Sequence, residues 1–295
     1  MSQMTATVRA LGALSPEARD FVGLLQQELA QRELELPSYP NVVVQLQQLL
    51  ADDDVSTDRV VRVVSVEPVL AARIVRLASS VALNPRGTRV TDLRNAVARL
   101  GFNALRAAAT SFAVTQLRLA GRYASISAPL IKLWNENVSM AAAACVVARR
   151  CQRVSPDTAL FAGLVSGVGK ICLLARSVDS PYLMEHPVIF QEIVNDWHAE
   201  VAKALLASWG VADDVIDAVY GHQSAKAGAR CMFALTDVLA VGAVLSRHDL
   251  EADLRLQMLQ SGHSAQRLGL EPGDCATLMD DSREELTLLQ AVLAS

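Results

Sequence analysis

The sequence predicts an all-α protein, and three observations favour that fold class. Hydrophobic residues make up 52% of the 295 residues but aromatic residues only 4%, so Ala, Leu and Val must supply most of the core. Ala and Leu lose little conformational freedom in a helix. A helix start signal, serine followed by proline and an acid, occurs at Ser15-Pro16-Glu17 and again at Ser155-Pro156-Asp157. No stretch shows sustained two-residue alternation of apolar and polar residues, the pattern of a half-buried strand.

The first predicted helix begins at Pro16 and carries apolar residues at helical spacing as far as Leu29. The two prolines within Leu36–Pro40 break the helical pattern and form a turn. The three valines at 42–44 could begin a strand, but the leucines that follow continue with a helical period. We therefore predict a second helix over 42–50.

The next two helices are predicted from their start signals. Ser56 or Thr57 is expected to cap one of them, and Glu67-Pro68 to begin the other. Asn, Pro and Gly occur together at 84–87, which predicts a loop after these helices.

A further helix is expected to be capped by Thr91 and to end at Gly101, because glycine is the common helix-ending residue. Beyond it, a soft boundary near residues 120–130 separates an Arg-rich first half from an Ala-rich second half.

Positive charge is concentrated in the first half. Between Arg59 and Arg122 there are 11 Arg and no Lys against two acids, a net charge of +9, within a total of −4 for the chain. Such a segment could attract a nucleotide, a nucleic acid or an acidic partner. Charge runs are more often solvated helix faces or pair with acids elsewhere in the fold. The residues that we expect to form an interaction patch are Arg59, Arg62, Arg73 and Arg76.

The cysteines and apolar runs indicate a cytoplasmic protein. The five cysteines form no CxxC pair, which is typical of reduced core residues. The N-terminus has no apolar targeting segment, and the longest apolar runs noted, 138–148 and 232–245, are shorter than the ~20 residues of a membrane span. The cysteines are Cys145, Cys151, Cys172, Cys231 and Cys275.

The glycine-rich segment 163–170 resembles a phosphate-binding loop, but its spacing is wrong. Five residues separate Gly163 from Gly169 where the motif has four, and Ile171 replaces the Ser or Thr that binds magnesium. Ser166 lacks the flanking glycines of a hydrolase nucleophile. No HExxH or structural zinc spacing occurs.

Three polar residues lie on apolar helical faces: His198, His222 and Asp237. An inward-facing acid needs a partner, a proton or a metal ion, and two histidines with one carboxylate could hold a metal ion. Histidines on such faces are more often hydrogen-bonded core residues, and we favour that interpretation.

Several blocks of the chain, in the right order, resemble the HDOD domain. The first comprises 36–40 and Glu67–Ile74, and the second 90–97 followed by Leu100-Gly101. Leu133-Trp134 and then Phe161–Lys170 resemble the part related to HD phosphohydrolases. The segments 197–201 and 221–223 are similar to the later histidine-bearing region. The resemblance covers about residues 30 to 240.

The resemblance also indicates which positions differ from an active HD enzyme. There the signature His-Asp pair would occupy Ser166-Gly167, and further histidines would occupy the positions of Asn137 and Gln223. His198, His222 and Asp237 occupy the remaining matching positions. Lys170 is a lysine that would lie near a phosphate. Because the replacements are neutral, the resemblance implies a vestigial site without a metal ion or other cofactor.

The implied architecture is an HDOD-type helical bundle with two lobes. Residues 1–32 form an N-terminal helix, and residues 33–240 the HDOD domain. This domain is divided into an Arg-rich helical lobe at 33–125 and a degenerate HD-like lobe at 126–240. Residues 241–295 form a C-terminal helical extension.

HDOD domains are regarded as non-catalytic modules of bacterial signalling, so the resemblance implies a non-enzymatic signal-transduction regulator that binds a protein partner. The alternative is a residual metal-dependent phosphohydrolase or nucleotide-binding protein that uses His198, His222 and Asp237. Nucleic-acid binding is disfavoured, because the +9 segment lacks interleaved aromatic residues.

Overall fold

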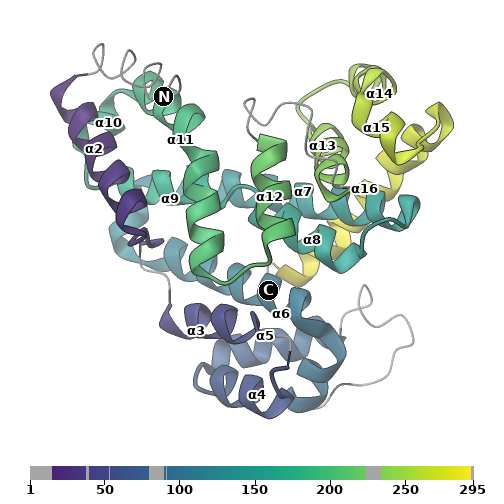
Figure 1. Ribbon diagram of the computed structural model, residues 1–295, viewed down its shortest axis with the longest axis horizontal. Coiled ribbons are helices and arrows are strands. Elements are labelled where there is room, and N and C mark those ends of the chain that lie inside the picture. Colours follow the sequence, from purple (N-terminus) through teal and green to yellow (C-terminus); the bar gives the residue numbers. More distant parts are fainter. Residues whose placement is uncertain are drawn as a thin grey trace.

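The structure is a computed structural model that describes residues 15–37, 40–52, 54–79, 90, 92–223 and 234–293. Within these ranges it contains helices and no strand, which confirms the predicted all-α class (Figure 1). The lower part of Figure 1 is a first lobe, built from α3 (Asn41–Leu49), α4 (Thr57–Ser65), α5 (Pro68–Ser79) and the start of α6 (Leu93–Leu119). Its core is made of Val, Leu, Ile and Ala side chains such as Leu46, Val60 and Ile74, all fully buried.

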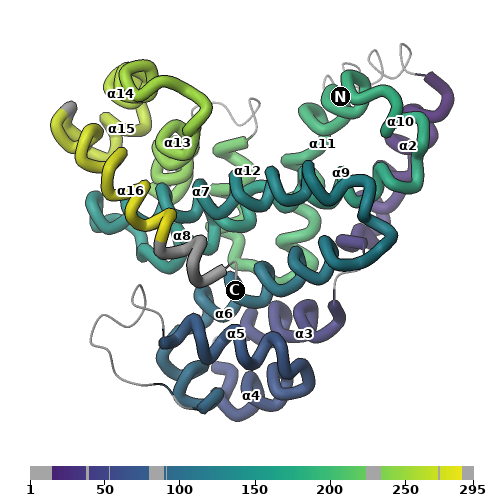
Figure 2. The backbone as a smooth tube through the Cα atoms, turned by 180° about the vertical axis from the view of Figure 1, so that it is seen from behind, coloured from purple at the N-terminus to yellow at the C-terminus, as the bar shows by residue number. Residues whose placement is uncertain are grey.

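The second lobe follows a short 3-10 helix, η1 (Gly121–Ile126), that lies within the soft boundary at 120–130. Its longest helix, α7 (Ser127–Cys151), crosses the middle of the lobe in both Figure 1 and Figure 2. The helices of this lobe are α7 (Ser127–Cys151), α8 (Pro156–Val165), α9 (Val168–Ser177), α10 (Pro181–Glu185), α11 (Pro187–Ser208), α12 (Asp213–Gln223) and α13 (Ala234–Leu245).

Small residues let the helices of the second lobe pack closely against α7. A Cβ atom on Gly163 of α8 would lie 2.7 Å from the Cα of Ala141, and one on Gly242 of α13 would lie 3.2 Å from the backbone nitrogen of Ala144. The run Ala141–Ala144 is fully buried between them. This arrangement is the one expected for an Ala-rich core with few aromatic residues.

Helices from both ends of the chain pack on the second lobe. At the N-terminal end of the chain, α2 (Pro16–Gln31) buries Ala18 and Val22 against Leu183 and Ile193 of α10 and α11. At the other end, the C-terminal helices pack on α7 and α13 (Figure 2), and α16 also contacts α5. They are α14 (Ala252–Ser261), α15 (His263–Leu268) and α16 (Pro272–Leu293).

The predicted helix starts at Ser15 and Ser56 are confirmed. The Ser15 hydroxyl accepts a hydrogen bond from the backbone nitrogen of Ala18 at 3.2 Å, and that of Ser56 accepts one from Arg59 at 3.4 Å. The helix predicted over 42–50 is also confirmed, as α3, so the three valines do not begin a strand.

The prediction for the start of α6 is one residue early. Asp92, and not Thr91, is the N-cap, because its carboxylate accepts a hydrogen bond from the backbone nitrogen of Asn95 at 2.8 Å. Gly101 adopts a left-handed φ of 73° and interrupts α6 at the predicted helix end, but a second helical segment continues to Leu119. Thr91 itself, the loop at 84–87, and Ser38 and Tyr39 of the predicted turn lie outside the described residues.

One stretch, Pro156–Ser177, has the length and apolar composition to cross a membrane, and it is not one of the two runs noted in the sequence. It comprises α8 and α9, and 89% of its most apolar 18-residue segment is buried inside the protein. The stretch therefore forms part of the core of the second lobe.

The cysteines that the structure describes are all free, and two lie deep in the second lobe. Burial raises the pKa of the Cys145 thiol to about 12 and that of Cys172 to about 11. Such thiols are unreactive core groups, as the sequence indicates. Cys231 lies outside the described residues.

Candidate functional site

The turn between α8 and α9 forms the floor of the candidate site. Ser166 and Gly167 make this turn, and the Ser166 hydroxyl donates a hydrogen bond to the carbonyl of Gly163 at 2.7 Å. From α12, the side-chain nitrogen of Gln223 donates to the backbone carbonyl of Ser166. The structure therefore brings three predicted positions together: Ser166 and Gly167 form the turn, and Gln223 binds to it.

Asn137 of α7 occupies the space beside Gly167. A Cβ atom built on Gly167 would overlap the side-chain amide of Asn137, which is only 5% exposed. The Asn137 amide nitrogen and the Gln223 amide oxygen are both buried and have no hydrogen-bond partner among the described residues. A side chain at position 167 would therefore require Asn137 to move.

His198 reaches the site from α11, which packs tightly on the start of α9. A Cβ atom on Gly169 would overlap the backbone carbonyl oxygen of His198, so only glycine allows this approach. The His198 Nδ1 lies 2.8 Å from the carbonyl oxygen of Val194, which can only accept, so Nδ1 carries the proton. Burial is the main cause that lowers the pKa of His198; the bond to Val194 raises it, and the charge of Lys170 lowers it.

His222 completes a group of three basic side chains. Burial lowers its pKa to about 4, and the positive charges of Lys170 and then His198 contribute to the same shift. No carboxylate is among the causes that shift either histidine. The group of Lys170, His198 and His222 is therefore basic and without an acidic partner among the described residues.

Asp237 does not join this group. Its buried carboxylate accepts hydrogen bonds from the Nε of Arg267 at 2.8 Å and 3.1 Å, and a further short contact from Nη2 makes the pair bidentate. Arg267 also donates to the Ser264 hydroxyl at 3.1 Å. The partner that the buried acid requires is thus an arginine of α15, a residue that the sequence did not single out.

The residues at these positions do not fit a divalent metal ion. Among the described residues, no three His, Cys, Asp or Glu side chains come together in a group that could hold one. His198, His222 and Asp237 are all described, so the alternative metal-binding set of the sequence is not brought together. The two side chains that meet the turn at Ser166-Gly167, those of Asn137 and Gln223, are neutral amides.

The four predicted patch arginines fall into two kinds. Arg59 of α4 faces Asp52 at 3.9 Å with both side chains exposed, and Arg62 is exposed in the last turn of the same helix. Arg73 of α5 donates to the Thr115 hydroxyl at 3.1 Å and lies 5.8 Å from the centre of the Phe112 ring.

Arg73, Arg76 and Arg118 form one cluster of positive charge on α5 and α6. Burial lowers the pKa of Arg73, and the charges of Arg76 and then Arg118 lower it further, with no carboxylate among the causes. The sequence missed Arg118, since it lies 42 residues after Arg76 and only the packing of α5 on α6 brings them together.

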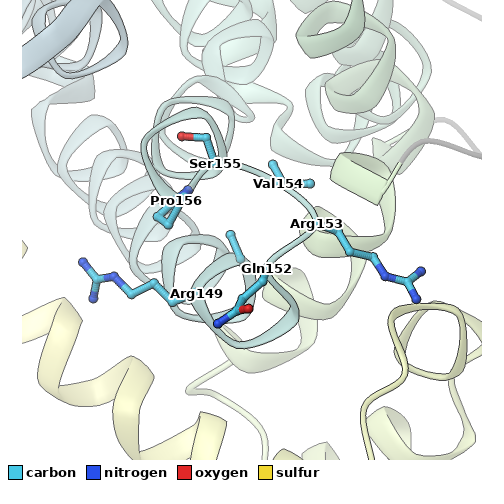
Figure 3. A pocket seen from close by; sticks show the side chains of 7 residues that line it. Arg149, Gln152, Arg153, Val154, Ser155 and Pro156 are labelled. Atoms are coloured by element: carbon cyan, nitrogen blue, oxygen red, sulfur yellow. The ribbon is translucent and has the colours of Figure 1, made fainter.

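A surface hollow lies at the turn between α7 and α8, and none of its lining residues is one of the predicted site positions (Figure 3). Its two arginines point apart in Figure 3 and are held by the C-terminal helices. Arg149 makes a bidentate pair with Glu285, at 2.6 Å and 3.3 Å, and Arg153 donates to the carbonyl of Arg267 at 3.0 Å. These arginines stabilise the packing of the C-terminal helices on the second lobe.

The fold and these positions define an HD-like helical protein. The HDOD domain family matches residues 36–225, more than half of the chain. The chain therefore belongs to the HDOD family, as the sequence resemblance implied. No curated protein matches it.

Solved structures share the whole fold. A proposed metal-dependent phosphohydrolase from Shewanella amazonensis SB2B is 23% identical, with a TM-score of 0.73 over 95% of this chain and 100% of that one. An HDOD domain protein of unknown function from Geobacter sulfurreducens is 23% identical, with a TM-score of 0.63 over 91% and 99%. A proposed signal transduction protein from Marinobacter aquaeolei VT8 is 20% identical, with a TM-score of 0.62 over 96% and 67%. At these identities the likeness shows the fold alone.

Proposed function

We propose that this chain is a non-enzymatic regulator of bacterial signal transduction that acts in the cytoplasm by binding a protein partner. Membership of the HDOD family supports a signalling role, as does the fold shared with the Marinobacter aquaeolei signal transduction protein. The observation that carries the non-enzymatic part is the replacement of charged ligands by neutral groups at the turn between α8 and α9.

Two contacts oppose a hydrolytic role for the site. Asn137 fills the space that a carboxylate at position 167 would need. Arg267 neutralises Asp237, the one acid at a matching position. Metal-dependent phosphoester hydrolysis needs ligands that hold the ion and lower the pKa of a bound water. We therefore set aside the alternative, a phosphohydrolase that uses His198, His222 and Asp237.

The surface of α5 and α6 is the candidate for partner binding. The hydrogen bond from Arg73 to Thr115 fixes how the two helices face each other, and they run in opposite directions (Figure 2). One helical turn away from this bond, Val69 lies four residues before Arg73 on α5 and Leu119 lies four residues after Thr115 on α6. These two side chains are 51% and 73% exposed. Val66, at the end of α4, is 79% exposed. Apolar side chains beside arginines are typical of protein interfaces.

The experiment is complementation of a strain that lacks the gene. The readout is the gene-expression profile of the complemented strain. We expect the double variant Arg73→Glu, Arg76→Glu not to restore the wild-type profile, because reversed charge repels an acidic partner. Arg94→Glu is the matched control, since Arg94 is an exposed arginine of the same lobe that pairs with Asp58. Full recovery by the double variant, at equal protein level, would contradict the assignment of this surface.

A further inference from the structure

We propose that this chain binds a second copy of itself, with arginines on α5 of one copy facing carboxylates on α11 of the other. The inference rests on the proposed function in one respect, since it uses the same arginine surface. A second copy and the protein partner would therefore exclude each other there. The carboxylates on α11 take no part in the proposed function, so the two roles can be tested separately.

The first observation is a stripe on α5 that begins with an apolar side chain and continues with arginines. Val69, Arg73 and Arg76 follow one another at spacings of four and three residues, which place them on one face of the helix. Val69 and Arg76 are exposed, and Arg73 is half-buried. Arg118 of α6 adds positive charge beside Arg73. Within the described part of the chain, neither Arg73 nor Arg118 forms an ion pair. We call the three residues of α5 the arginine stripe.

The second observation is a stripe of the same form and of opposite charge on α11. Val188, Glu192 and Asp196 follow one another at spacings of four residues, and all three side chains are exposed. Neither carboxylate forms an ion pair among the residues that the structure describes. The segment 181–200 around them holds four acids and no Lys or Arg. We call these three residues the acidic stripe.

The two stripes match in spacing as well as in charge. Because a helix rises 1.5 Å per residue, the first charged residue of each stripe lies about 6 Å along the axis from the valine and the second about 10–12 Å. When α5 of one copy lies beside α11 of another in the same direction, the two valines meet and both arginines face carboxylates. Arginine can bind a carboxylate through two parallel hydrogen bonds, and the valines remove apolar surface from water. The chain therefore carries a partner for its own arginine stripe.

The third observation is the separation of the two stripes within one copy. The start of α11, next to α10, lies in the upper part of Figures 1 and 2, and α5 lies in the lower part of both. One copy cannot bring its own stripes together, so the contact must join different copies. Because the two surfaces differ, the contact is head to tail. Exposed ion pairs are screened by salt, so the association should weaken as the ionic strength rises.

The test is analytical ultracentrifugation of the full chain, with charge-reversed variants of each stripe. We expect the wild type to form species larger than the monomer at about 0.05 M salt and to dissociate towards about 0.5 M salt. Glu192→Arg with Asp196→Arg should weaken self-association at least about tenfold, because like charges then face each other. Arg73→Glu with Arg76→Glu should have the same effect. A mixture of the two double variants should associate again, since each meets opposite charge on the other at both stripes.

Glu251→Arg with Asp253→Arg is the matched control. These two exposed acids lie at the start of α14 beside the exposed Leu254, so the variant makes the same change of charge on another partly apolar surface and should associate as the wild type does. If the double variant of the arginine stripe fails to fold, as judged by its melting curve, Arg76→Glu alone replaces it, because Arg76 is exposed.

Complementation separates this inference from the proposed function. The double variant of the acidic stripe leaves the arginine surface intact, so it should restore the wild-type expression profile although it no longer self-associates. A wild type that stays monomeric at low salt would overturn the inference and leave the proposed function untouched. An acidic-stripe variant that associates normally, or a mixture that stays monomeric, would overturn it equally.

Discussion

The protein holds two groups of basic side chains, and their surroundings differ. In the first lobe, Arg73, Arg76 and Arg118 lie at the surface of α5 and α6 close to exposed apolar residues. In the second lobe, Lys170 and two histidines surround the buried start of α9 beside an unpartnered amide. The first, outer group (Arg73, Arg76 and Arg118) suits a large partner that brings its own apolar surface. In the second, inner group (Lys170, His198 and His222), burial lowers the pKa of both histidines. Positive charge alone would not distinguish the two.

The largest expected effect comes from a substitution that disrupts the inner group and leaves the outer group in place. Gly169→Ala should lower the free energy of unfolding by about 3 kcal/mol, because the new methyl group would overlap the backbone of α11 at His198. Urea denaturation measures the change.

Gly23→Ala is the control for this substitution. Gly23 lies within α2 and a Cβ atom there meets nothing within 4 Å, so the helix should be stabilised by about 0.5–1 kcal/mol. Equal stability of the Gly169→Ala variant and the wild type would show that α9 and α11 do not need this close approach.

A smaller effect tests whether Asp237 is held by Arg267 and not by the inner group. Arg267→Met should destabilise the protein by about 2 kcal/mol, since it leaves a buried carboxylate without its partner. The value is below that of a fully buried pair because the arginine is half exposed.

Arg283→Met removes the exposed pair with Asp280 and should cost less than about 0.5 kcal/mol. Both variants are compared by thermal and urea denaturation. If Arg267→Met were as stable as Arg283→Met, the pair with Asp237 would be a surface contact of no consequence.

The effect that is smallest at neutral pH concerns the titration of His222. The pKa of His222 is lowered to about 4, below the 6.5 of the unfolded chain, so the unfolded state binds more protons between these values. Stability should therefore fall as the pH falls from about 6.5 to about 4. His222→Gln cannot take up this proton, and its unfolding should bind about one proton fewer in that range.

Denaturation at a series of pH values in phosphate-free buffer gives the proton uptake of each variant. His186→Gln is the control, since His186 is exposed and lies between α10 and α11, outside the inner group. An unchanged pH dependence in His222→Gln would mean that His222 is not held neutral by its surroundings.

Local signals in the sequence were sufficient for the helices. Ser15 and Ser56 cap helices as their chemistry predicts, and the leucines after Val44 correctly favour a helix over a strand. The cap at Asp92 was missed because two adjacent residues, Thr91 and Asp92, both have capping side chains, and only the backbone decides between them.

The candidate site was predictable only in part. Gln223 and Asn137 meet the turn at Ser166-Gly167, as their matching positions imply. The partner of Asp237 could not be predicted, because Arg267 lies 30 residues away and the chain has 23 arginines from which to choose. The overlap of Asn137 with Gly167 was likewise invisible, since it depends on how α7 crosses the turn. Long-range pairs of this kind are set by tertiary packing and leave no local signal.

The most direct test of the central claim is the metal content of protein purified without chelators, compared with a His198→Ala and His222→Ala double variant. With Asn137 at the turn and Asp237 held by Arg267, we predict less than about a tenth of an equivalent of divalent metal in both proteins. About one equivalent in the wild type that is lost in the double variant would contradict the account, and would identify the site as that of a metal-dependent enzyme.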